Sequence, residues 1–294
     1  MLGIILGAIV LINGTFLVKF VMDLLAHREE TKAEPAPTVG LAISSFIMFF
    51  LSTFGISDFA ISTVLYRKLK WVDDKRLPGT LNTQCVLPVA VMALSYISGI
   101  QVDLTTLLVC IGAQILGAYV GPRFVVKLPV ELIRKFIGIG LVIASTLIVA
   151  GKMNIIPSGG TATGLYGVKL VVTAILIFIF GALNNIGIGS YALTMVTVYG
   201  MGLNPGVAFP IMMGAATFSV PVGSMQFIKF GEYSRKITLF TSTLGVLGVL
   251  IAVFLVKSLD VSMLQWLVAA ILLYSGASMI YEEFFKSKKM VEAN

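Results

Sequence analysis

The chain has 294 residues, of which 57% are hydrophobic and only 12% are charged, and its formal net charge is +7. A soluble domain carries about 25% charged residues, so this composition predicts an integral membrane protein with helical spans. The apolar runs are continuous, which argues against the alternating pattern of a membrane β-barrel. The lysines and arginines lie in short loops between these runs, as in inner-leaflet anchoring, so no nucleic-acid partner is expected.

Seven segments are long and apolar enough to cross a bilayer at about 20 residues per crossing. They are residues 2–24, 80–101, 103–122, 131–150, 210–228, 237–256 and 262–281. The first lacks a basic start and a small-residue cleavage site, so it is expected to be a retained span and not a signal peptide. A linker from His27 to Glu34 follows it; this linker carries charges of both signs and is expected to be a solvated connector.

Two further apolar segments, 39–70 and 165–199, contain one motif twice. The first copy, FGISDFAIST, begins at residue 54, and the second, IGIGSYALTM, begins at residue 186. As continuous helices these segments would be about 45–50 Å long, which is too long for a hydrocarbon core of about 30 Å. Each is therefore predicted to break near the glycines of its motif and to form a hairpin of two half-helices.

The charge of the loops indicates from which side of the membrane each hairpin enters. Loops 67–76, 123–135 and 229–236 and the C-terminus are rich in lysine and arginine, whereas loop 199–209 carries no charge. The positive-inside rule places the basic segments in the cytoplasm. All loops agree only if the first hairpin enters from the inner side and the second from the outer side. This assignment predicts an N-terminus outside the cell and a C-terminus in the cytoplasm.

The predicted fold is an all-α polytopic membrane protein with two inverted-topology repeats. Each repeat is one re-entrant helical hairpin plus three transmembrane helices, and because three is odd the two copies must face opposite ways. The expected division is an extra N-terminal transmembrane helix with a cytoplasmic linker (1–34), a first repeat (35–150), a second repeat (151–286) and a cytoplasmic tail (287–294).

The candidate site is formed by the two hairpin tips near the bilayer midplane. A helix that begins there offers unpaired N–H groups and the positive end of its dipole, which together attract an anion. The candidate substrate-binding residues are Gly55, Ser57 and Asp58 at the first tip, and Asn184, Asn185, Gly187, Gly189 and Ser190 at the second. The alternative is that the serines only cap helices and the glycines only allow close packing.

The spans that follow the hairpins supply a second set of candidate residues. Pro88 and Pro221 lie at nearly matching positions in these spans, and a mid-span proline frees a carbonyl and lets the helix bend. Polar side chains close to these prolines are candidates to face the substrate cavity: Asn82, Thr83, Gln84 and Thr217. The alternative is that they only form hydrogen bonds between helices.

Asp58 is the one acid that is expected deep in the membrane. A charged carboxylate there costs on the order of 3 kcal/mol, so it needs a proton, a cation or the amide groups of its own helix end. Asp58 is therefore a candidate proton-coupling residue, and a helix cap is the equal alternative. Its counterpart in the second motif is Ser190, which makes the predicted site asymmetric.

The doubled segment, with glycine-rich loops at 54–58 and 184–190, resembles the TauE/SafE family of membrane permeases, the sulfite exporter family. The likeness extends over nearly the whole chain through the order of segments and the duplication. Members typically have a run of glycines and then a proline, but here Ser57 and Asp58 stand where glycines are usual and neither copy has that proline. The resemblance implies transport of sulfite, sulfoacetate or a related small organosulfur anion.

The sequence thus predicts a secondary transporter of small anions in the cell inner membrane, with alternating access around the hairpin tips. A passive anion channel and a transporter of small carboxylates remain as alternatives. An enzyme is not expected, because His27 is the only histidine and lies in a loop, and Asp58 is the only acid expected deep in the membrane.

The expected partners are a small anionic substrate and the lipid bilayer. No cofactor or metal is predicted, because Cys85 and Cys110 lie inside apolar segments and are expected to be packing residues. Gly3 and Gly7, like Gly117 and Gly121, are four positions apart, a spacing that suits either close helix packing or the seam of a homodimer.

Overall fold

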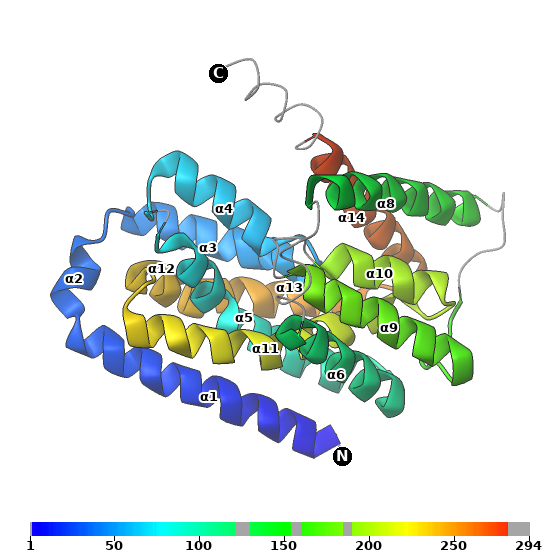
Figure 1. The fold of residues 1–294 in the computed structure, drawn as a ribbon, viewed down its shortest axis with the longest axis horizontal. Helices are drawn as coiled ribbons and strands as arrows, with labels where there is room; N and C mark the ends of the chain where they lie inside the picture. Colours follow the sequence, from blue (N-terminus) through cyan, green and yellow to red (C-terminus); the bar gives the residue numbers. More distant parts are fainter. Residues whose placement is uncertain (1, 74, 121–129, 154–159, 185–189, 282–294) are drawn as a thin grey trace. The chain divides into compact units, whose positions relative to one another are not determined.

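The computed structural model describes residues 2–73, 75–120, 130–153, 160–184 and 190–281, and no strand occurs within these ranges (Figure 1). The elements are α1 (Leu2–Ala26), α2 (Arg28–Ala33), α3 (Thr38–Thr53), α4 (Asp58–Leu69), α5 (Leu77–Gly99), α6 (Leu104–Val120), α8 (Val130–Lys152), α9 (Gly167–Asn184), α10 (Ser190–Gly200), η1 (Pro205–Val207), α11 (Ala208–Phe230), α12 (Arg235–Phe240), η2 (Thr241–Gly245), α13 (Val246–Ser258) and α14 (Val261–Tyr281). The predicted all-α class is therefore confirmed for the described part of the chain.

Four described helices are long and apolar enough to cross a membrane. They span Leu2–Ala26, Leu77–Gly99, Pro205–Phe230 and Arg235–Val256, and they coincide with four of the seven predicted spans. The other three predicted spans correspond to α6, α8 and α14, which contain shorter apolar stretches. Several apolar helices of this kind support a multi-pass location in the membrane.

Contacts divide the chain into two compact units. The first contains Met1–Ile100 and Met213–Ser258, and the second contains Gln101–Met212 and Leu259–Asn294. The chain passes from the second unit to the first within α11. Each unit therefore combines helices from both halves of the sequence.

The first hairpin segment is two helices, α3 and α4, joined by a short turn. Gly55 lies in this turn with φ of +97°, a backbone conformation that favours glycine. The N–H of Gly55 donates to the carbonyl of Ser52 (2.8 Å), which closes the last turn of α3. At 1.5 Å per residue, α3 and α4 are about 24 Å and 18 Å long, so each covers only part of a hydrocarbon core of about 30 Å.

In the first unit, α3 packs closely against η2 and α13. A Cβ atom added to Gly248 would lie 2.4 Å from the carbonyl oxygen of Phe46, and one added to Gly245 would lie 2.8 Å from the Phe49 ring. Only glycine allows the two backbones to come this close, as small residues do between membrane helices.

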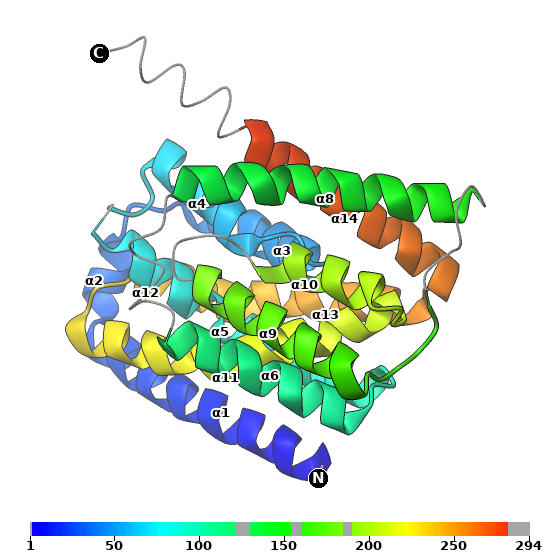
Figure 2. The same ribbon diagram turned by 45° about the vertical axis from the view of Figure 1, so that its right-hand side comes forward.

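In the second unit, α9 packs against α6 in a similar way (Figure 2). A Cβ atom at Gly117 would lie 2.0 Å from the carbonyl oxygen of Phe178, and one at Gly181 would lie 2.3 Å from the carbonyl oxygen of Gln114. Of the two expectations for Gly117, close helix packing is therefore the one that the structure shows. Its predicted companion Gly121 lies outside the described residues.

The linker between α1 and α3 is mostly exposed, as expected of a solvated connector, but it also binds the helices of the first unit. Two of its acids and Asp23 of α1 bind Arg235 at the start of α12, and the Arg235 side chain is only 5% exposed. The Arg235 Nε and Nη2 atoms reach the two Asp23 oxygens at 2.7 and 3.3 Å, and Nη1 reaches Glu30 at 3.4 Å. Such a fork of donors matches a carboxylate in both position and charge.

Glu34 completes this cluster by capping α12. Its carboxylate accepts hydrogen bonds from the backbone N–H groups of Arg235 and Lys236, both at 3.0 Å. An acid at a helix N-terminus satisfies unpaired donors and complements the helix dipole. Sequence reasoning missed these contacts because the partners lie in opposite halves of the chain.

A second polar cluster, centred on Asp103, caps α6 in the second unit. The Asp103 carboxylate accepts from the Thr106 N–H at 2.8 Å, and these hydrogen bonds hold the pKa of Asp103 below its usual value. The Asp103 N–H in turn donates to the carbonyl of Thr163 (2.8 Å), and Tyr166 donates to the same carboxylate at 3.3 Å. These contacts tie the segment before α9 to the start of α6.

Candidate functional site

The first predicted tip lies inside the protein. Gly55 is buried, Ser57 is half-buried, and Asp58, the first residue of α4, is only 2% exposed. The carbonyl of Ser57 accepts the first hydrogen bond of α4, from the N–H of Ile61 (3.2 Å). The three predicted residues of this tip therefore form the end of the turn and the beginning of a half-length helix.

The carboxylate of Asp58 is only partly satisfied. Ser52 at the end of α3 donates its hydroxyl to Oδ1 of Asp58 (3.2 Å), and the N–H groups of Asp58 and Phe59 also attract the carboxylate. The other oxygen, Oδ2, is buried and has no hydrogen-bond partner among the described residues. A buried carboxylate oxygen without a partner calls for a proton or a cation.

A row of polar side chains continues from Asp58 along one face of α4. Asp58, Ser62 and Tyr66 follow one another at four-residue spacing and are each at most 2% exposed. Gln84 of α5 connects the last two: its Nε2 donates to Ser62 Oγ (2.8 Å), and its Oε1 accepts from the Tyr66 hydroxyl (2.5 Å). Ser62 also reaches Met48 Sδ of α3 at 2.6 Å, so the row holds both arms of the hairpin and α5 together.

The three neighbouring candidates of α5 do not share one surface. Only Gln84 reaches the hairpin. Thr83 pairs with Thr238 of α12 through their hydroxyls (2.8 Å), and Asn82 donates to the carbonyl of Pro78 in its own helix (2.8 Å). The alternative of a hydrogen bond between helices therefore describes Thr83, whereas Asn82 bonds only within its own helix.

Three further polar residues of this candidate site were not predicted from the sequence: Ser52, Ser62 and Tyr66. The sequence does contain a signal for two of them, because Asp58, Ser62 and Tyr66 have the spacing of one helix face. Polar residues on one face of a membrane half-helix are expected to point at protein or a cavity, because lipid cannot satisfy them.

The second predicted tip is described only at its edges. Ser190 begins α10, is 3% exposed and accepts a hydrogen bond from Nε2 of Gln114 in α6 (3.2 Å). One turn later, Thr194 is fully buried, and its hydroxyl has no hydrogen-bond partner among the described residues. Asn184 ends α9, whereas Asn185, Gly187 and Gly189 lie outside the described residues.

Thr217 of α11 is 1% exposed and is already bound within the first unit. Asn13 of α1 donates its Nδ2 to the hydroxyl oxygen of Thr217 (2.9 Å) and to its carbonyl oxygen (3.2 Å). No pattern in the sequence indicates this contact, because Asn13 lies in a span outside the two predicted repeats.

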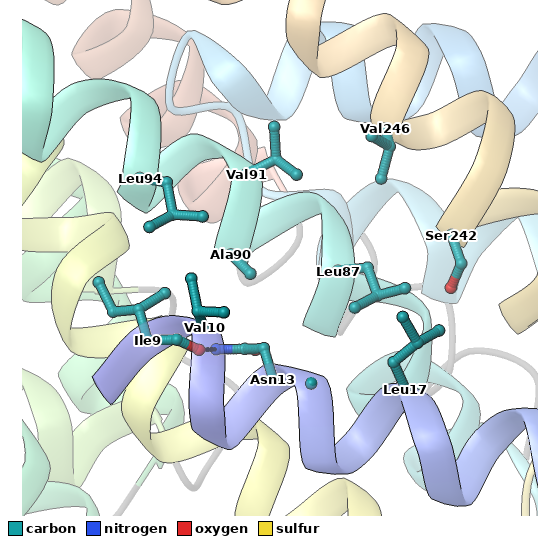
Figure 3. A pocket seen from close by; sticks show the side chains of 11 residues that line it. Ile9, Val10, Asn13, Leu17, Leu87, Ala90, Val91, Leu94, Ser242 and Val246 are labelled. Atoms are coloured by element: carbon teal, nitrogen blue, oxygen red, sulfur yellow. Dashed lines mark hydrogen bonds between the residues drawn. The ribbon is translucent and has the colours of Figure 1, made fainter. Parts of the chain in front are cut away.

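A groove of about 310 Å³ lies beside this contact (Figure 3). Its walls come from α1, α5, η2 and α13, and they are apolar except for Asn13 and Ser242. Figure 3 also shows the hydrogen bond from Asn13 to the carbonyl of Ile9 (2.8 Å). The groove contains none of the predicted substrate-binding residues, so it is not the predicted anion site.

The comparisons with known proteins identify the family of the chain. A family model described as sulfite exporter TauE/SafE matches residues 1–148. No match was found among curated proteins or among solved structures. The matched part runs from α1 into α8 and includes the whole first hairpin. Because the match covers half of the chain, the protein belongs to the TauE/SafE sulfite exporter family, which is a family of membrane transporters.

Proposed function

We propose that the protein is a secondary transporter of a small sulfur-containing anion, such as sulfite or sulfoacetate. The tips of the two hairpins would hold the anion near the bilayer midplane and expose it to the two sides in turn. The observation that carries this proposal is the buried start of α4 at Asp58, inside a segment of a TauE/SafE family member. The N–H groups of a helix that begins inside the membrane can bind an anion without a buried lysine or arginine.

Alternating access fits a chain of two inverted repeats, and the close helix contacts of the two units support that relation. Phe46 faces Gly248 across α3 and α13, and Phe178 faces Gly117 across α9 and α6. The offset from Phe46 to Phe178 equals the offset between the two motifs, and the offset from Gly117 to Gly248 is shorter by a single position. Each hairpin thus packs its first helix, by the same residue pair, on a helix from the other half of the sequence.

The ends of the paired helices support the same relation. Asp103 caps α6 and Ser234 caps α12. The sequence offset between these two caps is the same as that between Gly117 and Gly248, so the caps correspond. Glu34, before the first hairpin, binds the start of α12, and its counterpart Tyr166, at the offset of the two motifs, binds the cap of α6. Corresponding residues make corresponding contacts in both units, as is expected of a duplicated chain, and the loop charges support the inversion.

The charge of the bound anion gives Asp58 a role. An anion and an ionised carboxylate close together in a medium of low dielectric cannot both keep their charge. Oδ2 of Asp58 has no protein donor among the described residues, so a proton is the simplest neutralising partner. We therefore propose that the anion and a proton bind together, and that Asp58 carries the proton.

Flux measurements in liposomes test the proposed function. Liposomes that contain the purified protein should release trapped sulfite faster than protein-free liposomes. In a counterflow experiment, an opposing gradient of unlabelled sulfite should drive uptake of labelled sulfite against its own gradient. A passive channel would give flux without counterflow. Acetate and other small carboxylates should compete poorly; if they are carried and sulfite is not, the sulfur assignment fails and a carboxylate transporter replaces it.

Replacing Asp58 with asparagine tests the coupling. The Asp58→Asn variant keeps the size of the side chain but cannot release a proton, so its sulfite flux should fall at least about tenfold and lose its dependence on pH. Ser57→Ala at the neighbouring position serves as the control and should keep the pH profile of the wild type. An unchanged pH profile in Asp58→Asn would leave Asp58 as a helix cap.

The orientation in the membrane and the oligomeric state are further proposals. We propose that the N-terminus lies outside and that the C-terminus and the α4–α5 loop lie in the cytoplasm, because the basic loops then share one side. We also propose that a homodimer forms through α1, since nothing lies within 4 Å of a Cβ atom added to Gly3 or Gly7.

A further inference from the structure

Pro221 leaves one carbonyl of α11 without its normal helical partner. In an α-helix the carbonyl of residue 217 accepts from the N–H of residue 221, and proline has no N–H. The helix nevertheless runs without interruption from Ala208 to Phe230. Within a bilayer a free carbonyl must be satisfied by a neighbouring helix or by water, because lipid offers no donor.

Asn13 supplies the missing donor. Its Nδ2 lies 3.2 Å from the carbonyl oxygen of Thr217, the group that Pro221 cannot bind, and 2.9 Å from the Thr217 hydroxyl oxygen. The carbonyl oxygen of Ile9 in α1 lies at 2.8 Å, so the two hydrogens of this amide are shared among three acceptors. Both side chains are buried, with 4% of Asn13 and 1% of Thr217 exposed. Thr15, the nearest other polar residue of α1, bonds only to its own helix, at the carbonyl of Leu11 (2.8 Å).

The same contact determines how the Thr217 hydroxyl is used. Because its oxygen accepts a hydrogen bond from Asn13, the hydroxyl is left with its hydrogen as a donor. A donor is what an anionic substrate needs from a polar side chain at the proline-bearing part of α11.

Packing around Asn13 holds the middle part of α1 against α5 and α11. Phe16 and Phe20 of α1 lie in one buried cluster with Val86 of α5 and Ile228 of α11. Figures 1 and 2 both show α1 running beside α11. The span that lies outside the two repeats is therefore built onto the helix that carries Thr217 and Pro221.

We infer that Asn13 is a positioning residue for transport: it replaces the hydrogen bond that Pro221 removes and holds the Thr217 hydroxyl as a donor to the substrate. This inference rests on the proposed function for the role of Thr217. It assigns a task to α1, which the duplicated architecture alone leaves without one.

A double-mutant cycle tests the contact independently of any substrate. The variants are Asn13→Leu, Pro221→Ala and the combination of the two, with Thr15→Val as a matched control in the same helix. Asn13→Leu alone should lower the Tm of the detergent-purified protein. In the Pro221→Ala background, Asn13→Leu should lower the Tm by less than half as much as in the wild type. The reason is that alanine at position 221 restores an N–H group that binds the carbonyl of Thr217. Equal Tm losses with and without Pro221→Ala would overturn the inference.

Sulfite flux tests the positioning role with the same proteins. Asn13→Leu should raise the KM for sulfite about tenfold, as the loss of one hydrogen bond to an anion would, with little change in the maximal rate. Asn13→Ser, which retains a shorter donor, should lie between wild type and Asn13→Leu, and Thr15→Val should match wild type. An unchanged KM in Asn13→Leu would overturn the positioning role even if the Tm cycle shows coupling. If the wild type carries no sulfite, the proposed function fails, whereas the Tm cycle still decides whether Asn13 serves the Thr217 carbonyl.

Discussion

Alanine in place of Gly117 should destabilise the second unit by about 1–3 kcal/mol, because α6 and α9 leave no room for a side chain. The added Cβ would lie 2.0 Å from the carbonyl oxygen of Phe178, and a backbone atom cannot move aside as the end of a flexible side chain can. Thermal unfolding in detergent should record the loss as a lower Tm. The Tm of Gly112→Ala in the same helix should not fall, since a Cβ atom there has nothing within 4 Å.

The equivalent substitution in the first unit tests the close approach of α3 and α13. Gly248→Ala would bring its Cβ to 2.4 Å from the carbonyl oxygen of Phe46, so a loss of similar size is expected. Two equal losses would fit the predicted duplication. If Gly117→Ala and Gly112→Ala had the same Tm, the close approach of α6 and α9 would be contradicted.

Methionine in place of Arg235 should cost on the order of 3 kcal/mol of stability, because it leaves Asp23 largely buried without its cation. Arg235 and Asp23 are joined by two hydrogen bonds, and their side chains are only 5% and 13% exposed. The linker that carries Glu30 and Glu34 would also lose an anchor at the start of α12. Chemical or thermal denaturation of the purified protein measures the effect.

The control for this variant removes a positive charge elsewhere. Lys229 is exposed and lies in the last turn of α11, shortly before α12. Lys229→Met should change the stability by less than about 0.5 kcal/mol. Adding Asp23→Leu to Arg235→Met should recover part of the loss, since the largely buried carboxylate is then removed together with its cation. A loss in Arg235→Met no larger than in Lys229→Met would contradict the buried cluster.

The helical class and the position of the first break could be predicted from the sequence because both follow from local rules. One continuous helix over 39–70 is too long for the hydrocarbon core, and Gly55 is the residue that can take the left-handed turn. The burial of Asp58 follows from the same rule, since this residue comes soon after the break. The local sequence pattern and the thickness of the membrane together were enough to predict these features.

The partners of these residues could not be predicted, because they come from distant parts of the chain. Asn13 meets Thr217 across 204 residues, and Arg235 meets Asp23 across 212. The mixed charge of the α1–α3 linker is typical of a solvated surface. Nothing in it indicates that Glu30 and Glu34 both bind Arg235. Charge composition gives the net charge of a segment, but it does not identify the residue that binds it in the folded protein.

The proposed anion site depends above all on the entry of the two hairpins from opposite sides of the membrane, and cysteine labelling tests this entry most directly. In a background with Cys85 and Cys110, both buried, replaced by alanine, a single cysteine replaces Lys70 after α4 or Gly200 at the end of α10, both exposed. A membrane-impermeant maleimide is then applied to right-side-out and to inside-out vesicles. We expect the Lys70→Cys protein to react only from the cytoplasmic face and the Gly200→Cys protein only from the outer face. Reaction of both from the same face would contradict the inverted hairpins.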